Sequence, residues 1–446
     1  MKQNLLNFSL FILAASAILS HCGSAAELDR APLALANSLL ATNQASIEDL
    51  VSEALEHNPE LNFYKVEIAA AKAELRTAGT VANPEASTQV GAKRATDART
   101  GLVGEGVAWS VSVLQTFEYP GRLGLRKAIA NRQIELADLG YAQFRAGLKA
   151  RVRSLAYAAH VAQQKESAAS EVADRFQALM EVLVQREPAG VTPLLETRII
   201  EANAVTAQRR ASQARQGARM ATLELNQLRG QPVEASIKIG PVHLVFRPPK
   251  GLDTLLAVAR TNSFELSIRQ AELAQQGFKV SLSRNERYPS VAVGPFYSEE
   301  SVGEKNRTMG LGLSLALPLW NRHAGVIETA KARQQQAEVS VLLTERQIDR
   351  KVTENAFAYE VKLAEMSRWQ PDAPEKLREA AEIGDRNYRL GAVPIAIYVE
   401  LQKQYLEAVE ALLDTKKEAL DAAQELELLT GSRLYELEVI SKNAHP

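Results

Sequence analysis

The sequence contains a single cysteine, Cys22, which excludes a disulfide framework and a thiolate-ligated metal site. Its six histidines are scattered, and none lies at the spacing that metal ligands need. Phosphate loops, dinucleotide fingerprints and nucleophile elbows are missing as well. Carboxylate pairs such as Glu299 and Glu300 are better explained as solvated loop charges than as catalytic partners. We therefore predict no enzymatic activity, no catalytic residue, no cofactor and no resident metal.

Charge of one sign and long apolar runs are also scarce. The net charge is −1, with acidic and basic residues mixed along the chain, so nothing favours nucleic acid as a partner. Aromatic residues make up only 6%, and many apolar residues are alanine, which suits long, closely packed helices. Beyond the N-terminus no apolar run approaches the ~20 residues of a spanning helix. A membrane crossing would therefore have to use strands closed into a barrel.

The N-terminus has the features of an export signal. Lys2 supplies a positive start, residues 5–19 are almost wholly apolar, and small residues follow. A cut after Ala26 satisfies the small-x-small rule. We predict a signal peptide over residues 1–26 and an N-terminal extension over residues 27–45.

A second interpretation of this segment stays open. Residues 19–22, Leu-Ser-His-Cys, resemble the lipobox of bacterial lipoproteins, in which Cys22 would carry the lipid. His21 departs from that pattern, because the position normally holds Gly, Ala or Ser. Cys22 is therefore a candidate for lipidation.

Residues 308–318 alternate large apolar residues with small ones, and a period of two predicts a strand. About ten residues is the length of a tilted membrane-spanning strand. One face would meet lipid, while Gly310, Gly312, Ser314 and Ala316 would face the lumen; a strand of a soluble sandwich is the alternative. Residues 107–113 alternate in the same way. The predicted lipid-facing residues are Val107, Trp109, Val111, Val113, Met309, Leu311, Leu313, Leu315 and Leu317.

Two blocks of the chain share one layout, which predicts an internal duplication. Leu50 and Leu61 recur 205 residues later as Leu255 and Leu266, and a Gly-x-x-Pro turn at Gly190 recurs at Gly391. The predicted parts are a first repeat 46–230 with strand pair 84–117 and helical hairpin 122–230, a connector 231–250, a second repeat 251–431 with strand pair 290–318 and helical hairpin 320–431, and a C-terminal tail 432–446.

Within each repeat we expect a helix, two strands joined by a polar loop (94–101 and 298–306), and very long helices. The helix from Arg122 to about Gln185 would measure on the order of 95 Å. Pro371 and Pro374 interrupt the second hairpin, and Asp372 offers a cap for the restart. Coiled-coil spacing is clearest along one seam: Leu401, Tyr405, Ala408, Leu412, Thr415, Ala419, Ala422, Leu426 and Leu429.

Four strands cannot close a barrel, and an open edge in lipid leaves backbone groups without hydrogen bonds. The smallest spanning barrels have about eight strands and no room for water. Three chains would supply twelve strands and a water-filled lumen. The predicted fold is mainly α with a small β part, in which each chain adds four strands to a 12-stranded trimeric transmembrane barrel, continued by a long coiled-coil α-helical barrel.

These features together resemble the TolC-type outer-membrane efflux proteins. Residues 117–126 and 371–377 are similar to segments of CzcC-like channels in heavy-metal efflux systems. The resemblance implies a homotrimeric channel-tunnel in the outer membrane of a Gram-negative bacterium, in contact with its lipid and reaching into the periplasm. It also implies a periplasmic adaptor protein as partner and, through it, an inner-membrane pump of the RND class. The channel would be a passive exit duct, with metal cations as the substrate that the CzcC-like segments suggest.

The family's periplasmic tip motif, an Arg/Tyr-x-x-Gly turn with a nearby acidic residue, maps onto both hairpins. Acidic residues there form constricting rings in the family, which makes Glu196 and Glu400 candidates; solvated helix charges are the alternative. Val393 and Ile397 depart from the charged residues of some members, so a salt-bridge latch at those positions is not expected. The gate and adaptor-contact candidates are Gly190, Val191, Glu196, Arg389, Leu390, Gly391 and Glu400.

Two other functions remain open from the sequence. A type I protein-secretion conduit would have the same fold, and only a neighbouring pump would separate the two. A soluble periplasmic coiled-coil scaffold or adaptor is a different class, which predicts release without detergent. Adaptors usually have one helical hairpin, whereas this chain has two.

Overall fold

The computed structural model is mainly helical with few strands, as predicted. The chain separates into residues 1–43 and residues 44–446. The signal peptide, Cys22 and nearly all of the extension lie outside the described residues. Everything below concerns the second unit. The structure describes residues 45–97, 101–186, 194–240, 242–302, 304–370 and 372–439.

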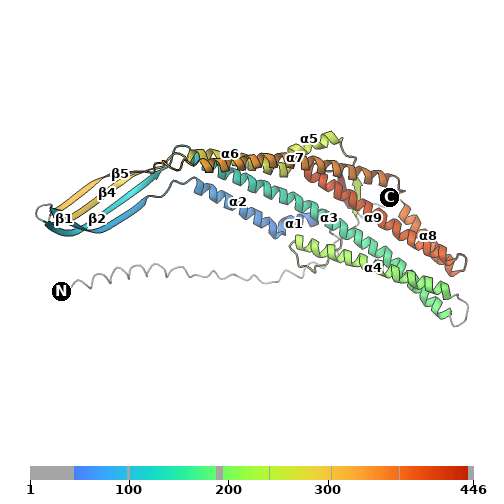
Figure 1. The fold of residues 1–446 in the computed structure, drawn as a ribbon. Coiled ribbons are helices and arrows are strands. Elements are labelled where there is room, and N and C mark those ends of the chain that lie inside the picture. The colour runs from blue at the N-terminus through green and yellow to red at the C-terminus, as the bar shows by residue number, and fades with distance from the viewer. Residues whose placement is uncertain are drawn as a thin grey trace, which may run out of the picture. The chain divides into compact units, whose positions relative to one another are not determined.

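The first half of this unit runs from two short helices through a strand pair to two long helices (Figure 1). Its elements are α1 Ile47–His57, α2 Pro59–Ala78, β1 Glu85–Asp97, β2 Gly101–Phe117, α3 Arg122–Arg186 and α4 Leu194–Leu228. The 65-residue α3 confirms the long helix expected from Arg122 onward.

The second half repeats this order of elements after a short strand, and it ends with another. Its elements are β3 Val242–Phe246, α5 Leu252–Asn262, α6 Phe264–Asn285, β4 Val291–Val302, β5 Glu304–Leu315, α7 Ala324–Ser367, α8 Ala373–Arg389, α9 Ile395–Thr430 and β6 Tyr435–Val439. Where the first half has the continuous α3, the second has α7 and α8.

In each half, an asparagine side chain joins the junction between the two short helices to the end of a long helix. Asn58, the break between α1 and α2, donates from Nδ2 to the Leu228 carbonyl at 2.9 Å, where α4 ends. Asn262, the last residue of α5, donates to the Thr430 carbonyl at 2.9 Å, where α9 ends. These bonds satisfy carbonyls that a helix end leaves without partners.

The strands extend further than predicted, because the polar segments 94–101 and 298–306 are mostly strand rather than loop. Opposite charges face each other across these strand ends. Arg94 pairs with Glu105, and Glu299 accepts from Arg307 Nε at 3.0 Å. Cross-strand ion pairs of this kind favour pairing without apolar alternation, so the alternation pattern marked only part of each strand.

A second, two-stranded sheet was not predicted. β3 pairs antiparallel with β6, so the connector and the expected C-terminal tail meet in one sheet. Ala45 adds a parallel bridge to Ile239. The connector contains no helix over its described residues, as expected. The expected tail therefore contains a strand that the sequence did not predict, Tyr435–Val439; residues 440–446 lie outside the described part.

The break between α7 and α8 lies where the prolines predicted it, but the cap is different. Asp372 holds the N-cap position of α8 without a side-chain hydrogen bond to the helix. Its carboxylate pairs instead with Lys376 Nζ at 2.8 Å. A cation within side-chain reach competes with the backbone N–H groups for an exposed carboxylate, which explains the difference. Pro371 lies outside the described residues.

The helices pack around two hydrophobic clusters. One gathers residues of α1, α3, α5, α7, α9 and the small sheet, and the other gathers residues of α3, α4, α8 and α9. Of the predicted α9 seam, Tyr405, Thr415, Ala419, Ala422, Leu426 and Leu429 are buried, and the other three are half-buried. Alanine at these positions lets helix backbones approach closely. Among the described helices, none has both the length and the apolarity needed to cross a bilayer.

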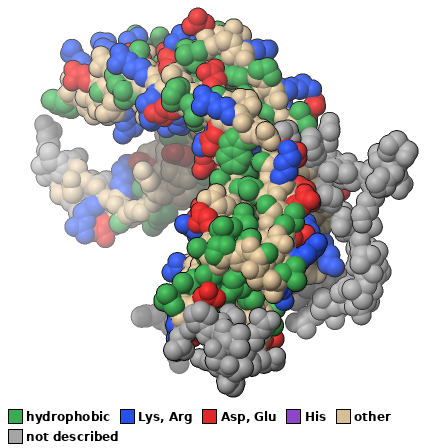
Figure 2. Space-filling model, turned by 90° about the vertical axis from the view of Figure 1, so that its right-hand side faces the viewer, with side chains coloured by type: hydrophobic (Ala, Val, Ile, Leu, Met, Phe, Trp, Pro, Cys, Tyr) green, Lys and Arg blue, Asp and Glu red, His purple; other side chains and the backbone are tan. Residues whose placement is uncertain are grey.

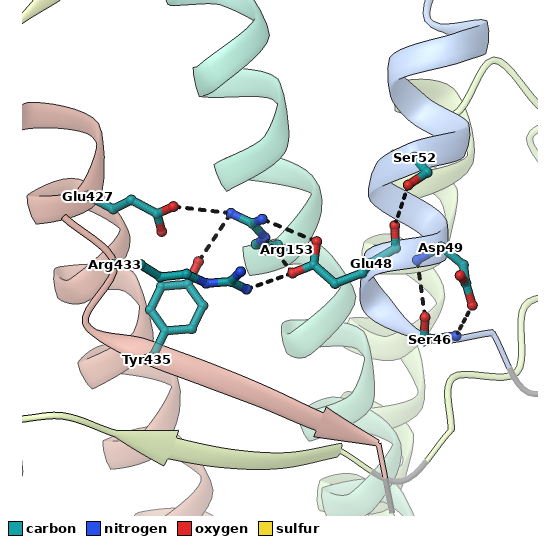
Figure 3. Close-up of polar contacts among 8 residues, drawn as sticks. All are labelled: Ser46, Glu48, Asp49, Ser52, Arg153, Glu427, Arg433 and Tyr435. Atoms are coloured by element: carbon teal, nitrogen blue, oxygen red, sulfur yellow. Dashed lines mark hydrogen bonds and ion pairs between the residues drawn. The ribbon is translucent and has the colours of Figure 1, made fainter. Parts of the chain in front are cut away.

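A polar cluster ties the start of α1 to α3 and the end of α9 (Figure 3). Arg153 on α3 donates to both carboxylate oxygens of Glu48, at 3.0 and 3.2 Å. Arg433 reaches the same carboxylate at 2.7 Å, and Glu427 lies 3.6 Å from Arg153 on its other side. Arg153 is only 9% exposed, so these carboxylates supply the partners that a buried cation requires.

Burial, the largest single influence on Glu48, raises its pKa, but the hydrogen bonds and charges of Arg153 and Arg433 outweigh it and lower the pKa below 4.5. A carboxylate with a lowered pKa stabilises the fold above its unfolded-state pKa. That contribution disappears as the pH falls through the lowered value. The exposed half of the Glu48 side chain limits the effect through solvent screening.

We predict that Glu48→Gln lowers the free energy of unfolding by about 1 kcal/mol at pH 7. The difference from wild type should vanish at acid pH, below the lowered pKa of Glu48, where both forms are neutral at this position. Denaturant unfolding followed by circular dichroism in detergent measures both values. Glu56→Gln, on an exposed α1 position, is the matched control and should have little effect at either pH. A Glu48→Gln deficit of the same size at both pH values would contradict the charge pairing.

Candidate functional site

The four-stranded sheet has the order β1-β2-β4-β5, with every neighbouring pair antiparallel (Figure 1). Residues directly opposite each other in such a ladder project from the same face. Val111 lies opposite Tyr297, which lies opposite Met309. This register places the apolar residues of β2 and those of β5 on one common face, hereafter the apolar face.

The apolar face is open to its surroundings. Met309, Leu311 and Leu313 are 80%, 78% and 71% exposed, so these side chains do not belong to a protein core. Val107, Trp109, Val111 and Val113 on β2 are between 37% and 57% exposed. Leu317, just beyond the end of β5, is also exposed. An exposed row of this kind marks an interaction surface rather than the inside of a sandwich.

The opposite face carries mostly small and polar residues. Ser87 and Ser112 hydrogen-bond across β1 and β2 at 2.8 Å. Phe296 is an exception, and its ring lies against Gly310, where a Cβ would come within 2.9 Å of it. The predicted small residues of β5 therefore do not face empty space everywhere, because part of their room is filled by this ring.

Aromatic side chains bound the apolar face at two levels along the strands. Trp109 and Tyr297 lie with ring centroids 5.3 Å apart at one level. At the helix-proximal level Tyr119 stacks on Tyr288 at 4.3 Å, and Trp320 is 93% exposed. The chain from Tyr288 to Tyr297 spans about 30 Å if extended. Amphipathic rings at both edges of an apolar band are typical of strands in a lipid bilayer.

The other predicted site is the turn between α8 and α9, which lies at the far end of the helices from the sheet (Figure 1). Leu390 ends α8 and is 76% exposed. Gly391 has φ of 75°, and the next N–H, of Ala392, returns to the Asn387 carbonyl at 2.8 Å. Glycine accommodates this left-handed conformation without steric cost, which allows the tight reversal between helices.

Aromatic packing joins all four helices beside this turn. Tyr398 of α9 is fully buried, stacks on Tyr388 of α8 at 5.2 Å and meets Phe176 of α3 edge-on at 5.5 Å. Tyr388 also donates to Glu196 of α4 at 3.4 Å. Glu196 is therefore half-buried and engaged, in contrast to a fully solvated charge.

The remaining predicted tip residues make contacts within their own helices. Arg389 donates to Asp385 at 2.9 Å, and Glu400 accepts from Gln404 at 2.6 Å. No described contact brings Glu196 and Glu400 together. On the face that carries this turn, basic and acidic side chains are interspersed (Figure 2). Gly190 and Val191 lie outside the described residues, so the role of this set stays a prediction.

Sequence reasoning missed a polar junction just behind the turn. Arg175 of α3, 13% exposed at its side chain, donates to Glu171 at 2.6 Å, to Glu382 of α8 at 3.4 Å and to Gln402 of α9 at 3.1 Å. Gln402 is fully buried and also donates to the Ala381 carbonyl at 2.8 Å. A glutamine beside the apolar seam of α9 was the available signal, since a buried amide requires partners on a neighbouring helix.

No three His, Cys, Asp or Glu side chains among the described residues are grouped closely enough to hold a metal ion.

Comparison with known proteins relates the second half of the chain to one family. Residues 255–432 match the family model described as "Outer membrane efflux protein". This match covers less than half of the chain, so the second half of the chain is similar to that family. The match agrees with the resemblance inferred from the sequence. The family description names an efflux protein and no enzyme, in agreement with the prediction of no enzymatic activity.

Among its relatives is the "Cobalt-zinc-cadmium resistance protein CzcC" of Cupriavidus metallidurans, 27% identical over 218 residues. That match covers 48% of this chain and 50% of CzcC, so the chain spans about half the length of this curated relative.

Solved structures share the fold. The CmeC outer membrane channel of Campylobacter jejuni has a TM-score of 0.67 at 16% identity, covering 86% of this chain and 85% of CmeC. CusC has a TM-score of 0.66 at 14% identity, covering 87% of this chain and 92% of CusC. At such identities the likeness establishes the fold only.

The two faces of β5 should respond differently to a buried charge. We predict that Leu313→Asp, on the apolar face, reduces the amount of protein assembled in the outer membrane severalfold, whereas Ser314→Asp on the opposite face does not. A charge facing lipid costs up to about 2–4 kcal/mol at mid-membrane, with Asp toward the lower end. Immunoblots of separated outer-membrane fractions measure the effect.

Leu313→Val is the control, because it keeps the apolar character of the position and should assemble normally. Equal losses for Leu313→Asp and Ser314→Asp would show that the two faces do not differ in their surroundings.

Proposed function

We propose that this protein is one subunit of a homotrimeric outer-membrane channel, which serves as the passive exit duct of a tripartite efflux system. The observation that carries the proposal is the exposed apolar face of an incomplete sheet. Within the described sheet, β1 and β5 each pair with one neighbour only. Both outer strands therefore have a row of backbone groups available for pairing.

Lipid offers those backbone groups no hydrogen bonds, so the sheet is stable in a bilayer only when its edges are closed. Pairing of β5 in one copy with β1 in the next closes a barrel of three copies and twelve strands. A barrel of that size exceeds the about eight strands whose side chains fill the interior. The mostly small and polar face then lines a lumen wide enough for water.

An internal duplication of the chain would explain how each copy contributes two similar parts to this barrel. Both halves have two short helices, a strand pair and long helices in the same order. Both also join a short helix to a long one through an asparagine, Asn58 or Asn262. Two similar halves in three copies give six similar units around one axis, and the long helices continue the barrel as a second tube.

Exposed apolar side chains on the helices support contacts between copies along this tube. Phe63 and Val66 are exposed on α2, and Leu342, Phe357 and Val361 are exposed on α7. α3 lies between the α2/α4 pair and the α6/α9 pair, while α7 packs on the outer side of α6 and α9. α2 and α7 therefore occupy opposite sides of the helical layer, where adjacent copies would meet.

The duct itself transfers no energy, so it depends on partners. A periplasmic adaptor would contact the α8–α9 turn and the α3–α4 turn, and an inner-membrane pump of the RND class would supply the driving force. Metal cations are the proposed cargo, supported by the likeness to CzcC. A lumen lined by small and polar side chains needs no ligand cluster, because the pump has already selected the cargo.

Membrane fractionation followed by sizing in detergent tests the channel. We expect the protein in the outer membrane with a protein mass near three times that of the mature chain, whose full-length precursor is 48.8 kDa. A monomer in the soluble fraction would refute the channel and favour a periplasmic scaffold.

Deletion of the gene tests the proposed cargo. It should raise the sensitivity of the cells to cobalt, zinc or cadmium. Loss of a secreted protein with unchanged metal tolerance would instead indicate a type I secretion conduit.

Arg175 offers a test of how the periplasmic end is held closed. Its bonds to Glu382 and Gln402 join the first hairpin to the second, so their loss should free the two hairpins to separate. Hydrogen bonds to charged groups contribute about 1.5–3 kcal/mol each, which corresponds to about a tenfold or larger shift toward the open state. We predict that Arg175→Ala raises the open probability by about this factor in planar-bilayer recordings.

Arg350→Ala is the matched control, since Arg350 forms an exposed pair with Glu354 within α7 and joins no other helix. It should leave the open probability unchanged. Trimer yield must be equal for both variants. An unchanged open probability in Arg175→Ala would show that this junction is not part of the closed state.

A further inference from the structure

A cavity of about 550 Å³ lies between α3, the start of α6 and the end of α9, away from the sheet and from the helical turns. This volume is within the range of small-molecule sites, about 300–1,000 Å³. None of the functions proposed above uses it. Its walls combine two unpaired basic side chains, a buried amide and aromatic rings.

The basic side chains come from one face of α3. Arg145, Lys149 and Arg153 follow one another at intervals of four residues, which aligns them along the helix. Arg153 is already neutralised by Glu48 and Glu427 (Figure 3). Arg145 and Lys149 have no hydrogen bond or ion pair within the described part of the chain. The cavity therefore retains positive charge that nothing described compensates.

Gln424 of α9 supplies an independent indication. The residue is 4% exposed and lines the cavity, yet its Nε2 atom has no hydrogen-bond partner among the described residues. A buried donor without an acceptor loses its hydrogen bonds to water and gains none in return, so native proteins rarely keep one. An acceptor placed in the cavity would remove this cost.

The rest of the lining is largely apolar. Tyr141 and Phe264 present aromatic rings, and alanines of α3 with Leu428 of α9 complete the wall. An inorganic anion would leave this surface unused. A ligand with an apolar body and one anionic end would match both the rings and the charged side chains.

We propose that this cavity binds a small organic carboxylate. Its carboxylate lies between Arg145 and Lys149 and accepts a hydrogen bond from Gln424 Nε2, while its apolar body packs against Tyr141 and Phe264. Charge-assisted bonds to two cations and a buried amide give the site its preference for an acid over a neutral analogue. The inference does not depend on the transport function, because it rests on a cavity within one chain.

Isothermal titration of the detergent-solubilised, full-length protein with benzoate tests the site, with benzamide as the neutral analogue. We expect saturable binding of benzoate and at least about tenfold weaker binding of benzamide. Arg145→Gln, Lys149→Gln and Gln424→Leu should each raise the dissociation constant for benzoate, the first two by about tenfold. Arg346→Gln, an exposed basic position on α7, is the control and should bind like wild type.

Three results would overturn the proposal. They are the absence of saturable binding to wild type, equal binding of benzoate and benzamide, and unchanged affinity in the Arg145→Gln and Lys149→Gln variants. Inorganic phosphate provides the remaining arm. If phosphate binds as tightly as benzoate and competes with it, the site recognises anions without regard to an organic body, which also contradicts the stated ligand class.

Discussion

Backbone hydrogen bonding across the four-stranded sheet decides how the rest of this chain can be used. The register aligns Val111, Tyr297 and Met309, and through them every large apolar residue of β2 and β5, on one side. A shift of one residue in any pair would turn an apolar row toward the polar face. The outward alternation and the free outer edges of β1 and β5 are the features on which the proposal of several copies in a bilayer rests.

The sequence predicted the elements that have a strong local period. Alternation over residues 308–318 identified the apolar face, and the uninterrupted pattern after Arg122 identified α3 to within a residue or two. The polar segments 94–101 and 298–306 were assigned to loops, because apolar residues stop alternating there although the strands continue beyond the apolar face. In these polar segments, ion pairs such as Glu299–Arg307 support the pairing of the strands, and such pairs leave no periodic pattern in the sequence.

Contacts between distant segments could not be predicted in the same way. β3 and β6 are five residues each and lie far apart in the chain, so neither has a local pattern that indicates its partner. The contact between Arg175 and Gln402 could not be predicted for a similar reason. A glutamine at a core position indicates that hydrogen-bond partners are needed, but the sequence does not show which residues they are. Candidate tip residues followed from family resemblance, and the structure adds that Glu196 is engaged by Tyr388 whereas Glu400 is not.

The interruption between α7 and α8 makes the two hairpins mechanically unequal. α3 is one continuous helix of 65 residues, whereas its counterpart is interrupted between Ser367 and Ala373. A continuous helix such as α3 transmits a twist along its whole length, whereas α7 and α8 can absorb a twist at the break between them. In the proposed trimer, any twisting would therefore concentrate its strain in the second hairpin of every copy, and the first hairpin would act as the stiff frame against which the second moves.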